Sequence, residues 1–379
     1  MAGPDPSARL DDRIAGFVED HVAKAAVQTD VSGRFPAQTM SAFMASGLAG
    51  LISAQEVGGE GAGPREAAAV VERIARQCGS TAMIVAMHYC GAAVIEAKGD
   101  EAVRRAVAEG RALATLAFSE AGSRSQFWAP VSTAERKGGE VVLNARKSWV
   151  TSANHADLYV WSSRPAEAEG LSTIWLVRRG LDGLQPGAAF DGLGLRGNDS
   201  ASLAATDVTI AAESILGEDG KGADVMLGVV LPIFSILNSA AALGLMTGAI
   251  ERTIAHVSGT RFEHTGGALR ELPTIRAYLA RMQVQKEMVR ALLDDAVAGL
   301  ERPDEATMLK VLQIKAAAGE TATEVLDLAM RVCGGAAFRK EVGVERLFRD
   351  ARASTVMAPT TDQLYDFIGR ALCGMDLFG

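Results

Sequence analysis

The spacing of apolar side chains divides the chain into three parts. In the first part, apolar residues recur every three or four positions, which predicts amphipathic helices. These segments are residues 10–25, 36–51, 63–79 and 99–117. A glycine-rich stretch precedes Pro64, a residue type that suits the first turn of a helix. We therefore predict a helical N-terminal domain over residues 1–117.

The hydrophobic period changes in the middle of the chain. Short β-branched and aromatic runs with partial alternation predict strands there. They occupy residues 140–153, 157–163, 172–179 and 200–210, and clusters of Gly, Asp, Asn and Pro separate them. We predict a small antiparallel β-domain over residues 118–221.

Helical periodicity returns after residue 221 and continues to the end of the chain. The predicted helices are residues 223–257, 272–300, 304–332 and 361–373. Three of them are long enough for a bundle whose interior is well covered. We predict a C-terminal helical domain over residues 222–379, so that the order along the chain is helical, β, helical.

One predicted helix is apolar enough to raise the question of a membrane. Val225 to Ile250 carries no charge over 26 residues, which is long enough to span a bilayer. However, Pro232 and Asn238 interrupt it, and no basic cluster or aromatic belt flanks it. Because a helix buried in a large helical domain or a subunit interface has the same composition, we predict burial in protein and no membrane.

The charge balance narrows the possible partners. The chain has 379 residues with 38 Lys+Arg and 46 Asp+Glu, a net charge of −8, and no basic run longer than two residues. A nucleic-acid partner requires a basic face, so we expect none.

The four cysteines are widely spaced and form no CxxC pair, and there is no HExxH, so we predict neither disulfides nor a metal site. The N-terminus has acids where a signal peptide needs an apolar core, and we expect a cytoplasmic protein.

Three short segments carry candidate chemistry. Residues 118–123 bring hydroxyls and free backbone N–H groups to a point where helix gives way to strand, which suits a polar heterocycle or phosphate, or a plain inter-domain turn. Trp149 beside Thr151 suits stacking and hydrogen bonding to a ring, although a strand Trp is more often core. Arg349 and Arg352 suit a phosphate, or else an ion-pair network within a helix.

Six segments in order resemble the acyl-CoA dehydrogenase family of flavoproteins. They include GLAGLISAQEVGGEGAG, LAFSEAGSRSQ, KSWVTSANHADLYV and VERLFRDAR, and they span residues 48–63, 116–126, 147–160, 192–210, 331–338 and 344–352. The resemblance implies an α+β, mostly helical fold with an N-terminal helical domain, a middle antiparallel β-domain and a C-terminal four-helix bundle. It also implies bound FAD and an acyl thioester substrate.

The resemblance assigns roles to individual residues near the flavin and the substrate. Phe118 and Ser119 would contact the flavin pyrimidine, and Trp149 would cover the isoalloxazine. Thr151 would donate a hydrogen bond to flavin N5. Ser125 would hold the phosphopantetheine region of the acyl-CoA.

Further residues would complete the cofactor site across a homodimer or homotetramer. Gly335 and Thr360 would touch the ADP moiety of the neighbouring subunit's FAD. Arg261 and Phe262 are a shifted counterpart of the family's Arg-x-x-Phe-Gly turn, and Arg331 stands where the family has a Gln on the adenine side.

The chain departs from the family at the catalytic base. The glutamate that takes the acyl α-proton falls on Ala358, and the alternative position used by a minority of members falls near Phe234. Neither side chain can act as a base. Weak substitutes are Asp362, which also reads as a helix N-cap, and His88. Glu120 matches a structural residue of the family and is not expected to be the base.

Three functions stay open on this sequence. The first is an FAD-dependent oxidoreductase that oxidises a CH–CH bond of an acyl-CoA or acyl-carrier-protein thioester, or a variant of that reaction, and passes electrons to a partner protein. The second is a flavin-dependent monooxygenase that receives reduced flavin from a reductase. The third is a non-catalytic flavin-binding relative. Fold alone does not choose among them.

Overall fold

The structure is a computed structural model that describes residues 6–123 and 126–376. The chain forms two units. The first unit comprises Met1–Ala67, Met83–Gly192 and Arg196–Phe234, and the second comprises Ala68–Ala82, Leu193–Leu195 and Ser235–Gly379.

Helices occupy most of the chain before residue 109. They are α1 (Pro6–Phe17), η1 (Val18–Val22), α2 (Ala23–Ser32), α3 (Ala37–Ala45), η2 (Leu48–Gly50), η3 (Gln55–Val57), α4 (Pro64–Ala75), α5 (Gly79–Lys98) and α6 (Glu101–Ala108). Asp100 caps α6, because its carboxylate accepts the N–H of Val103 at 2.9 Å. Gly110, with φ +67°, supplies the left-handed residue that follows the helix.

Two elements differ from the sequence prediction in this region. Helix α5 was not predicted, because it is apolar on nearly every side and shows no helical stripe. Residues Ala114–Ala117, predicted as the end of a helix, form strand β1 instead. All four are buried, and a short apolar run of this kind does not distinguish a buried strand from a helix segment.

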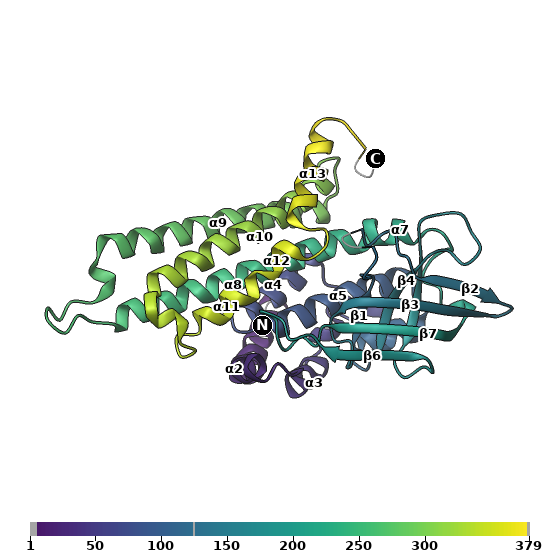
Figure 1. Cartoon of the computed structure of the whole chain (residues 1–379), viewed down its shortest axis with the longest axis horizontal. Coiled ribbons are helices and arrows are strands. Elements are labelled where there is room, and N and C mark those ends of the chain that lie inside the picture. The colour runs from purple at the N-terminus through teal and green to yellow at the C-terminus, as the bar shows by residue number, and fades with distance from the viewer. Residues whose placement is uncertain (1–5, 124–125, 377–379) are drawn as a thin grey trace, which may run out of the picture. The chain divides into compact units, whose positions relative to one another are not determined.

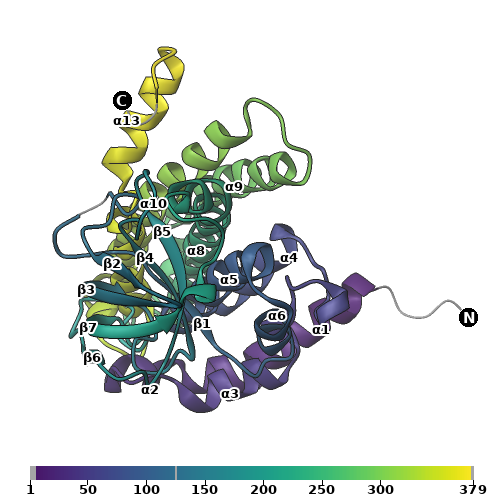
Figure 2. The same cartoon turned by 90° about the vertical axis from the view of Figure 1, so that its right-hand side faces the viewer.

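Within residues 6–123 and 126–376, seven strands build two sheets, and their labels can be followed in Figure 2. They are β1 (Ala114–Ala117), β2 (Thr133–Lys137), β3 (Glu140–Val150), β4 (Leu158–Ser163), β5 (Thr173–Arg178), β6 (Leu184–Ala189) and β7 (Ala201–Ala211). One sheet has the order β1-β4-β5 and the other the order β2-β3-β7-β6. The expected antiparallel pairing holds throughout except that β1 runs parallel to β4.

The two sheets share one hydrophobic core. Buried side chains of both contribute to it, among them Leu143, Tyr159, Trp161, Trp175 and Leu203. Strand β3 shows partial alternation of buried and exposed residues, whereas every residue of β4 is buried. A fully covered strand is expected in the middle of its sheet, which is where β4 lies.

The rest of the chain is helical again after the short turn η4 (Ala212–Ser214). The helices are α7 (Gly222–Val225), η5 (Met226–Val230), α8 (Leu231–Gly259), η6 (Leu269–Glu271), α9 (Pro273–Glu301), α10 (Thr307–Cys333), η7 (Gly334–Phe338), α11 (Val344–Ala351), α12 (Ala353–Val356) and α13 (Thr361–Leu372). Helices α9 and α10 run along each other, and α13 packs on α10 (Figure 1). The predicted mostly helical fold, with its β-domain between helical regions, is confirmed.

Two helical stretches are long and apolar enough to cross a membrane by length and composition, Gly79–Lys98 and Gly222–Gly259. In each, 78% of the most apolar window is buried inside the protein. The second stretch contains the uncharged segment Val225 to Ile250, so its hydrophobicity is explained by burial in protein, as predicted.

Candidate cofactor site

The ends of strands β1 and β3 lie side by side in the first unit. Phe118 and Ser119 follow directly after β1, and the Phe118 side chain is buried. The Ser119 carbonyl accepts a hydrogen bond from the backbone N–H of Ser148 at 2.9 Å. Two of the predicted flavin contacts are therefore tied to the end of β3, where the other two, Trp149 and Thr151, are found.

Trp149 lies in a β-bulge of strand β3. The β3–β7 register shifts between Lys147 and Val150, and Trp149 has φ +58°. Positive φ is unfavourable for a bulky residue and costs on the order of 1–3 kcal/mol, which the surrounding structure must offset. Bulges re-aim side chains. The indole is accordingly 65% exposed, in contrast to the predicted alternative of a core Trp.

A second aromatic side chain accompanies Trp149. The ring centroids of Trp149 and Phe190 are 4.6 Å apart with planes inclined by 54°. Phe190 is 36% exposed, so the pair presents an apolar surface to solvent. Such a surface is suited to stacking with a flat ring. Sequence reasoning missed Phe190, because it belongs to no motif and no spacing links it to Trp149.

The Thr151 hydroxyl is placed for a ligand at the same strand end. Thr151 is 5% exposed, and its carbonyl accepts a hydrogen bond from the Thr115 hydroxyl at 2.8 Å. Its own hydroxyl lies 3.5 Å from the Ser200 hydroxyl, at the long limit of a hydrogen bond. The Thr151 hydroxyl can therefore donate to another group without losing a strong partner. Ser200 is a second residue that the sequence analysis did not single out.

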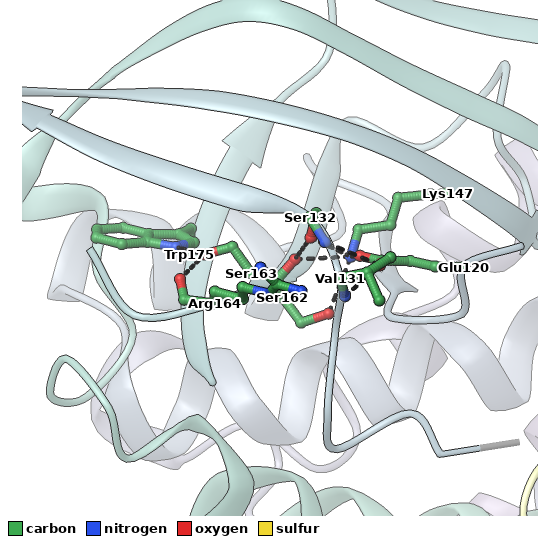
Figure 3. A network of polar contacts seen from close by, with 8 residues as sticks. All are labelled: Glu120, Val131, Ser132, Lys147, Ser162, Ser163, Arg164 and Trp175. Carbon is green, nitrogen blue, oxygen red and sulfur yellow. Dashed lines mark hydrogen bonds and ion pairs between the residues drawn. The ribbon is translucent and has the colours of Figure 1, made fainter. Parts of the chain in front are cut away.

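A buried polar network surrounds Glu120, the residue that follows Ser119 in sequence (Figure 3). Glu120 and Lys147 form an ion pair with side chains 2% and 0% exposed. The Lys147 ammonium also donates to the Ser162 carbonyl at 2.6 Å and the Ser162 hydroxyl at 3.0 Å. The second oxygen of Glu120 accepts the backbone N–H groups of Val131 at 2.7 Å and Ser132 at 3.0 Å.

Both members of this pair are charged near neutral pH. Burial alone raises the pKa of Glu120, but the charge and hydrogen bonds of Lys147, with those of Ser132 and Val131, outweigh it and hold that pKa below its ordinary value. Burial lowers the pKa of Lys147 to about 8, against the opposing pull of Glu120.

In the second unit, Ala358 lies in a loop that a buried lysine holds. Lys315 of α10 donates to the carbonyls of Met357 at 3.0 Å and Pro359 at 2.6 Å, the two residues that flank Ala358. Burial lowers the pKa of Lys315 to about 7. Thr360, next along the chain, caps α13 by accepting the N–H of Gln363 at 3.4 Å.

The remaining predicted cofactor residues belong to the end of α10, η7 and the α8–α9 connection. Arg331, in the last turn of α10, places its guanidinium 5.3 Å from the ring centroid of Tyr278 near the start of α9. Gly335 follows in η7 and is exposed. Arg261 and Phe262 belong to the α8–α9 connection, where the Arg261 guanidinium donates to the Gly266 carbonyl at 3.1 Å.

The structure does not bring Gly335 and Thr360 together within one chain. Thr360 lies beside Lys315, whereas Gly335 follows the end of α10. At 1.5 Å per residue, the 16 positions from Lys315 to Arg331 span about 24 Å. The two residues therefore lie near different parts of α10, and their shared contact with an ADP moiety stays a prediction.

The weak candidates for a base, His88 and Asp362, have very different surroundings. His88 is fully buried, accepts the N–H of Ala114 at 3.1 Å through Nδ1 and donates to the Ala49 carbonyl at 3.0 Å through Nε2. Burial lowers its pKa to about 4, so the ring is neutral with no free nitrogen. Asp362 is exposed in the first turn of α13, and the N-cap is Thr360 rather than Asp362.

Two further predictions concerned a phosphate site at Arg349 and a substrate contact at Ser125. Arg349 forms an ion pair with Glu345 at 2.7 Å within α11, which supports the helix-network interpretation of that segment rather than a phosphate site. Ser125, predicted to bind the substrate, lies outside the described residues.

Comparison with known proteins places these features in a family. Sequence models of the acyl-CoA dehydrogenase N-terminal, middle and C-terminal domains match residues 6–112, 115–208 and 202–373. Cyclohex-1-ene-1-carbonyl-CoA dehydrogenase of Syntrophus aciditrophicus (strain SB) is 30% identical over 371 residues, which cover 96% of this chain and 89% of that protein. Human mitochondrial short-chain specific acyl-CoA dehydrogenase is 29% identical over 369 residues, with 95% and 88% covered.

A solved structure agrees with this assignment at the level of the fold. Butyryl-CoA dehydrogenase from Megasphaera elsdenii superposes with a TM-score of 0.91 at 22% identity, covering 98% of this chain and 99% of that one. The chain belongs to the acyl-CoA dehydrogenase family.

Proposed function

We propose that this protein is an FAD-dependent oxidoreductase that acts on an acyl-CoA thioester. Its family membership and the acyl-CoA dehydrogenase names of its relatives support this function. The observation that carries the proposal is the strand end at Trp149. An exposed indole, forced outward by a bulge at φ +58°, lies beside a threonine hydroxyl that lacks a strong partner.

These side chains fit a flavin. Trp149 and Phe190 offer aromatic faces to the isoalloxazine, and Phe118 and Ser119 would contact its pyrimidine. The Thr151 hydroxyl would donate to N5. FAD, when bound, supplies a two-electron acceptor or donor. The protein's part is to orient the ring, exclude water and hold donors in fixed positions.

The second unit carries the residues that we infer bind ADP moieties. The first group of expected contacts comprises Arg331 and Gly335 at the end of α10 together with Arg261 and Phe262 of the α8–α9 connection, and Thr360 beside Lys315 is counted separately. We propose that the first group serves the FAD of a neighbouring subunit in a homodimer or homotetramer. We propose that the chain works as three domains, a helical domain of residues 1–117, a β-domain of residues 118–221 and a helical domain of residues 222–379.

An open cavity in the β-domain suits the carrier of the acyl group. It has a volume of about 440 Å³ and is lined by Ala121, Gly122, Asn144, Arg146 and Thr206, among others. We infer that CoA, with its amides and phosphates, binds along this cavity, where Asn144, Arg146 and Thr206 offer polar groups. The alternative carrier of the acyl group is an acyl carrier protein.

Ala358 favours a second candidate function. In a dehydrogenase the group at this position removes the acyl α-proton, and a methyl group cannot. His88 has both ring nitrogens hydrogen-bonded to backbone groups and is not free to replace it, and Asp362 stays an untested candidate. A monooxygenase that receives reduced flavin from a reductase needs no such base. Oxidation of the thioester without the usual base is our first candidate and oxygenation is the second.

One experiment separates the functions. The purified protein is expected to be yellow, and acyl-CoAs added without air should bleach the flavin if the first function is right. No bleaching, with oxygen uptake that depends on a flavin reductase, supports the monooxygenase. Tightly held flavin that responds to neither treatment supports a non-catalytic relative, and a protein that binds no FAD contradicts the proposal.

A further inference from the structure

The buried ion pair between Glu120 and Lys147 joins the two segments of the proposed flavin site. Glu120 is adjacent to Ser119 in sequence, and Lys147 precedes Trp149 by two residues. An isolated β-bridge pairs Glu120 with Lys147, and the Ser119 carbonyl accepts the N–H of Ser148 at 2.9 Å. The pair therefore sits at the junction of the segments that carry these contacts (Figure 3).

Ordinary strand pairing is interrupted at this junction. The β3–β7 ladder shifts register between Lys147 and Val150, so the bulge is not fixed by a continuous ladder on that side. The hydrogen bonds and ion pair of Glu120 and Lys147 connect β3 to neighbouring segments at this point. Lys147 reaches β4 through the Ser162 carbonyl and hydroxyl, and Glu120 holds the Val131–Ser132 segment through two backbone N–H groups.

Stability alone is a weak explanation for such a pair. Removing two charges from water costs about as much free energy as their attraction returns, and apolar replacements of buried pairs are often no less stable. A buried polar network whose members are hydrogen-bonded does, however, specify one geometry. Here the geometry that it specifies is the spacing between Ser119 and Trp149.

We propose that Glu120 and Lys147 are positioning residues that fix Ser119 and the Trp149–Thr151 bulge relative to each other and so set the flavin's surroundings. This role rests on the proposed FAD site. It assigns no direct contact with the flavin to either side chain. Loss of the pair is expected to change both the affinity for FAD and the reduction potential of the bound flavin.

The test replaces the carboxylate by its neutral isostere, Glu120→Gln. The amide oxygen can still accept the N–H groups of Val131 and Ser132, but the attraction for Lys147 is lost. We expect the dissociation constant for FAD to rise about tenfold or more, with a shifted flavin midpoint potential. The matched control is Glu96→Gln, which breaks the ion pair between Glu96 and Arg104. The side chain of Glu96 is 21% exposed and that of Arg104 is 20% exposed. The control should leave both quantities unchanged.

Each outcome bears on the proposal. A Glu120→Gln protein with the wild-type dissociation constant and midpoint potential would overturn the positioning role while leaving the FAD site intact. Wild-type protein that takes up no FAD would overturn the proposed function, and the role with it. If Glu120→Gln does not fold, Glu120→Asp keeps the charge but shortens the side chain that reaches Lys147, and a wild-type dissociation constant and potential in that variant would likewise overturn the role.

Discussion

Ala358 lies between two residues whose carbonyls accept hydrogen bonds from Lys315. If the family alignment is right, its methyl group faces the reacting carbons of the acyl chain. We predict that Ala358→Glu raises the turnover of straight-chain acyl-CoAs, because general-base catalysis is worth about 10²–10⁴-fold. The gain should fall at the low end, since Pro359 replaces the flexible glycine of the family and stiffens the backbone. Dye-linked turnover of short and medium acyl-CoAs measures it.

The matched control for this prediction is Ala358→Gln. Glutamine has nearly the shape of glutamate and no basic carboxylate, so it should leave turnover at the wild-type level. Equal gains in the two variants would mean that side-chain volume, not proton transfer, changed the rate. A wild-type protein that already works at ordinary dehydrogenase rates would place the base elsewhere.

Phe190 gives a second prediction at the scale of one residue. Its ring contacts Trp149, and aromatic pairs contribute about 0.5–1.5 kcal/mol beyond the area they bury. Phe190→Ala should therefore weaken FAD binding by roughly 2- to 10-fold, because about 1.4 kcal/mol corresponds to a factor of ten. Titration of the apoprotein with FAD measures the change. Val27→Ala, which trims an exposed side chain of α2, is the control and should have no effect.

Residue types were easier to predict than their surroundings. The sequence singled out Trp149 and Thr151, but it could not show that a bulge turns the indole outward, because that depends on the register between β3 and β7. It offered His88 as a base, and only the fold shows both ring nitrogens bonded to backbone groups. Phe190 was missed because its pairing with Trp149 arises from tertiary contact.

At the scale of elements, helix α10 and the Met357–Pro359 loop are joined by a titratable group. Burial lowers the pKa of Lys315 to about 7, whereas an unfolded lysine titrates near about 10.4. Between these values the unfolded chain holds a proton that the folded chain has released. The free energy of unfolding should therefore rise with pH in this window, and the contribution is lost as pH falls through about 7.

Chemical denaturation of wild type and Lys315→Met tests this pH dependence. The difference in unfolding free energy between the two proteins cancels the groups they share. We expect the wild type to gain stability relative to the variant by up to about 1.4 kcal/mol per pH unit between about pH 7 and about pH 9. A difference that stays flat over this range would show that the amine does not titrate there.

Elements with a clear period were predicted well, and some of those without one were not. The four helices predicted after residue 221 are found as α8, α9, α10 and α13, of which α8, like α5, is apolar on most sides. Helix α5 is apolar all round, so no stripe marks it. Strand β1 was assigned to a helix because a short buried run of mostly apolar residues fits either structure, and its parallel pairing with β4 depends on residues far away in sequence.

At the scale of the whole molecule, the fold followed from the order of six segments, whereas the assembly of the cofactor site did not. The resemblance placed Gly335 and Thr360 on one ADP moiety, but about 24 Å of α10 separates their surroundings in one chain. The number of residues between two positions in the sequence does not give their distance in a folded helical bundle. The separation favours a site completed by a second chain, which is an expectation about the oligomer.

The expected oligomer can be tested at Phe338, an exposed apolar residue close to Gly335 in sequence. Phe338, at the end of η7 and three residues after Gly335, is 84% exposed. A large apolar side chain in this position suggests that another surface covers it. We predict a stable dimer or larger oligomer whose formation is linked to FAD binding, so that Phe338→Ser weakens both. Burial of a Phe side chain contributes about 1.5–3 kcal/mol, and a twofold dimer buries it twice.

The dissociation constant of the oligomer should accordingly rise at least about tenfold in Phe338→Ser. Sedimentation velocity over a dilution series, with and without added FAD, measures this constant. Phe338→Tyr keeps the ring and should behave as wild type, which separates loss of apolar area from a general disturbance of η7. A wild-type protein that is monomeric at micromolar concentration and retains stoichiometric FAD would contradict the shared site, because each chain would then complete its own.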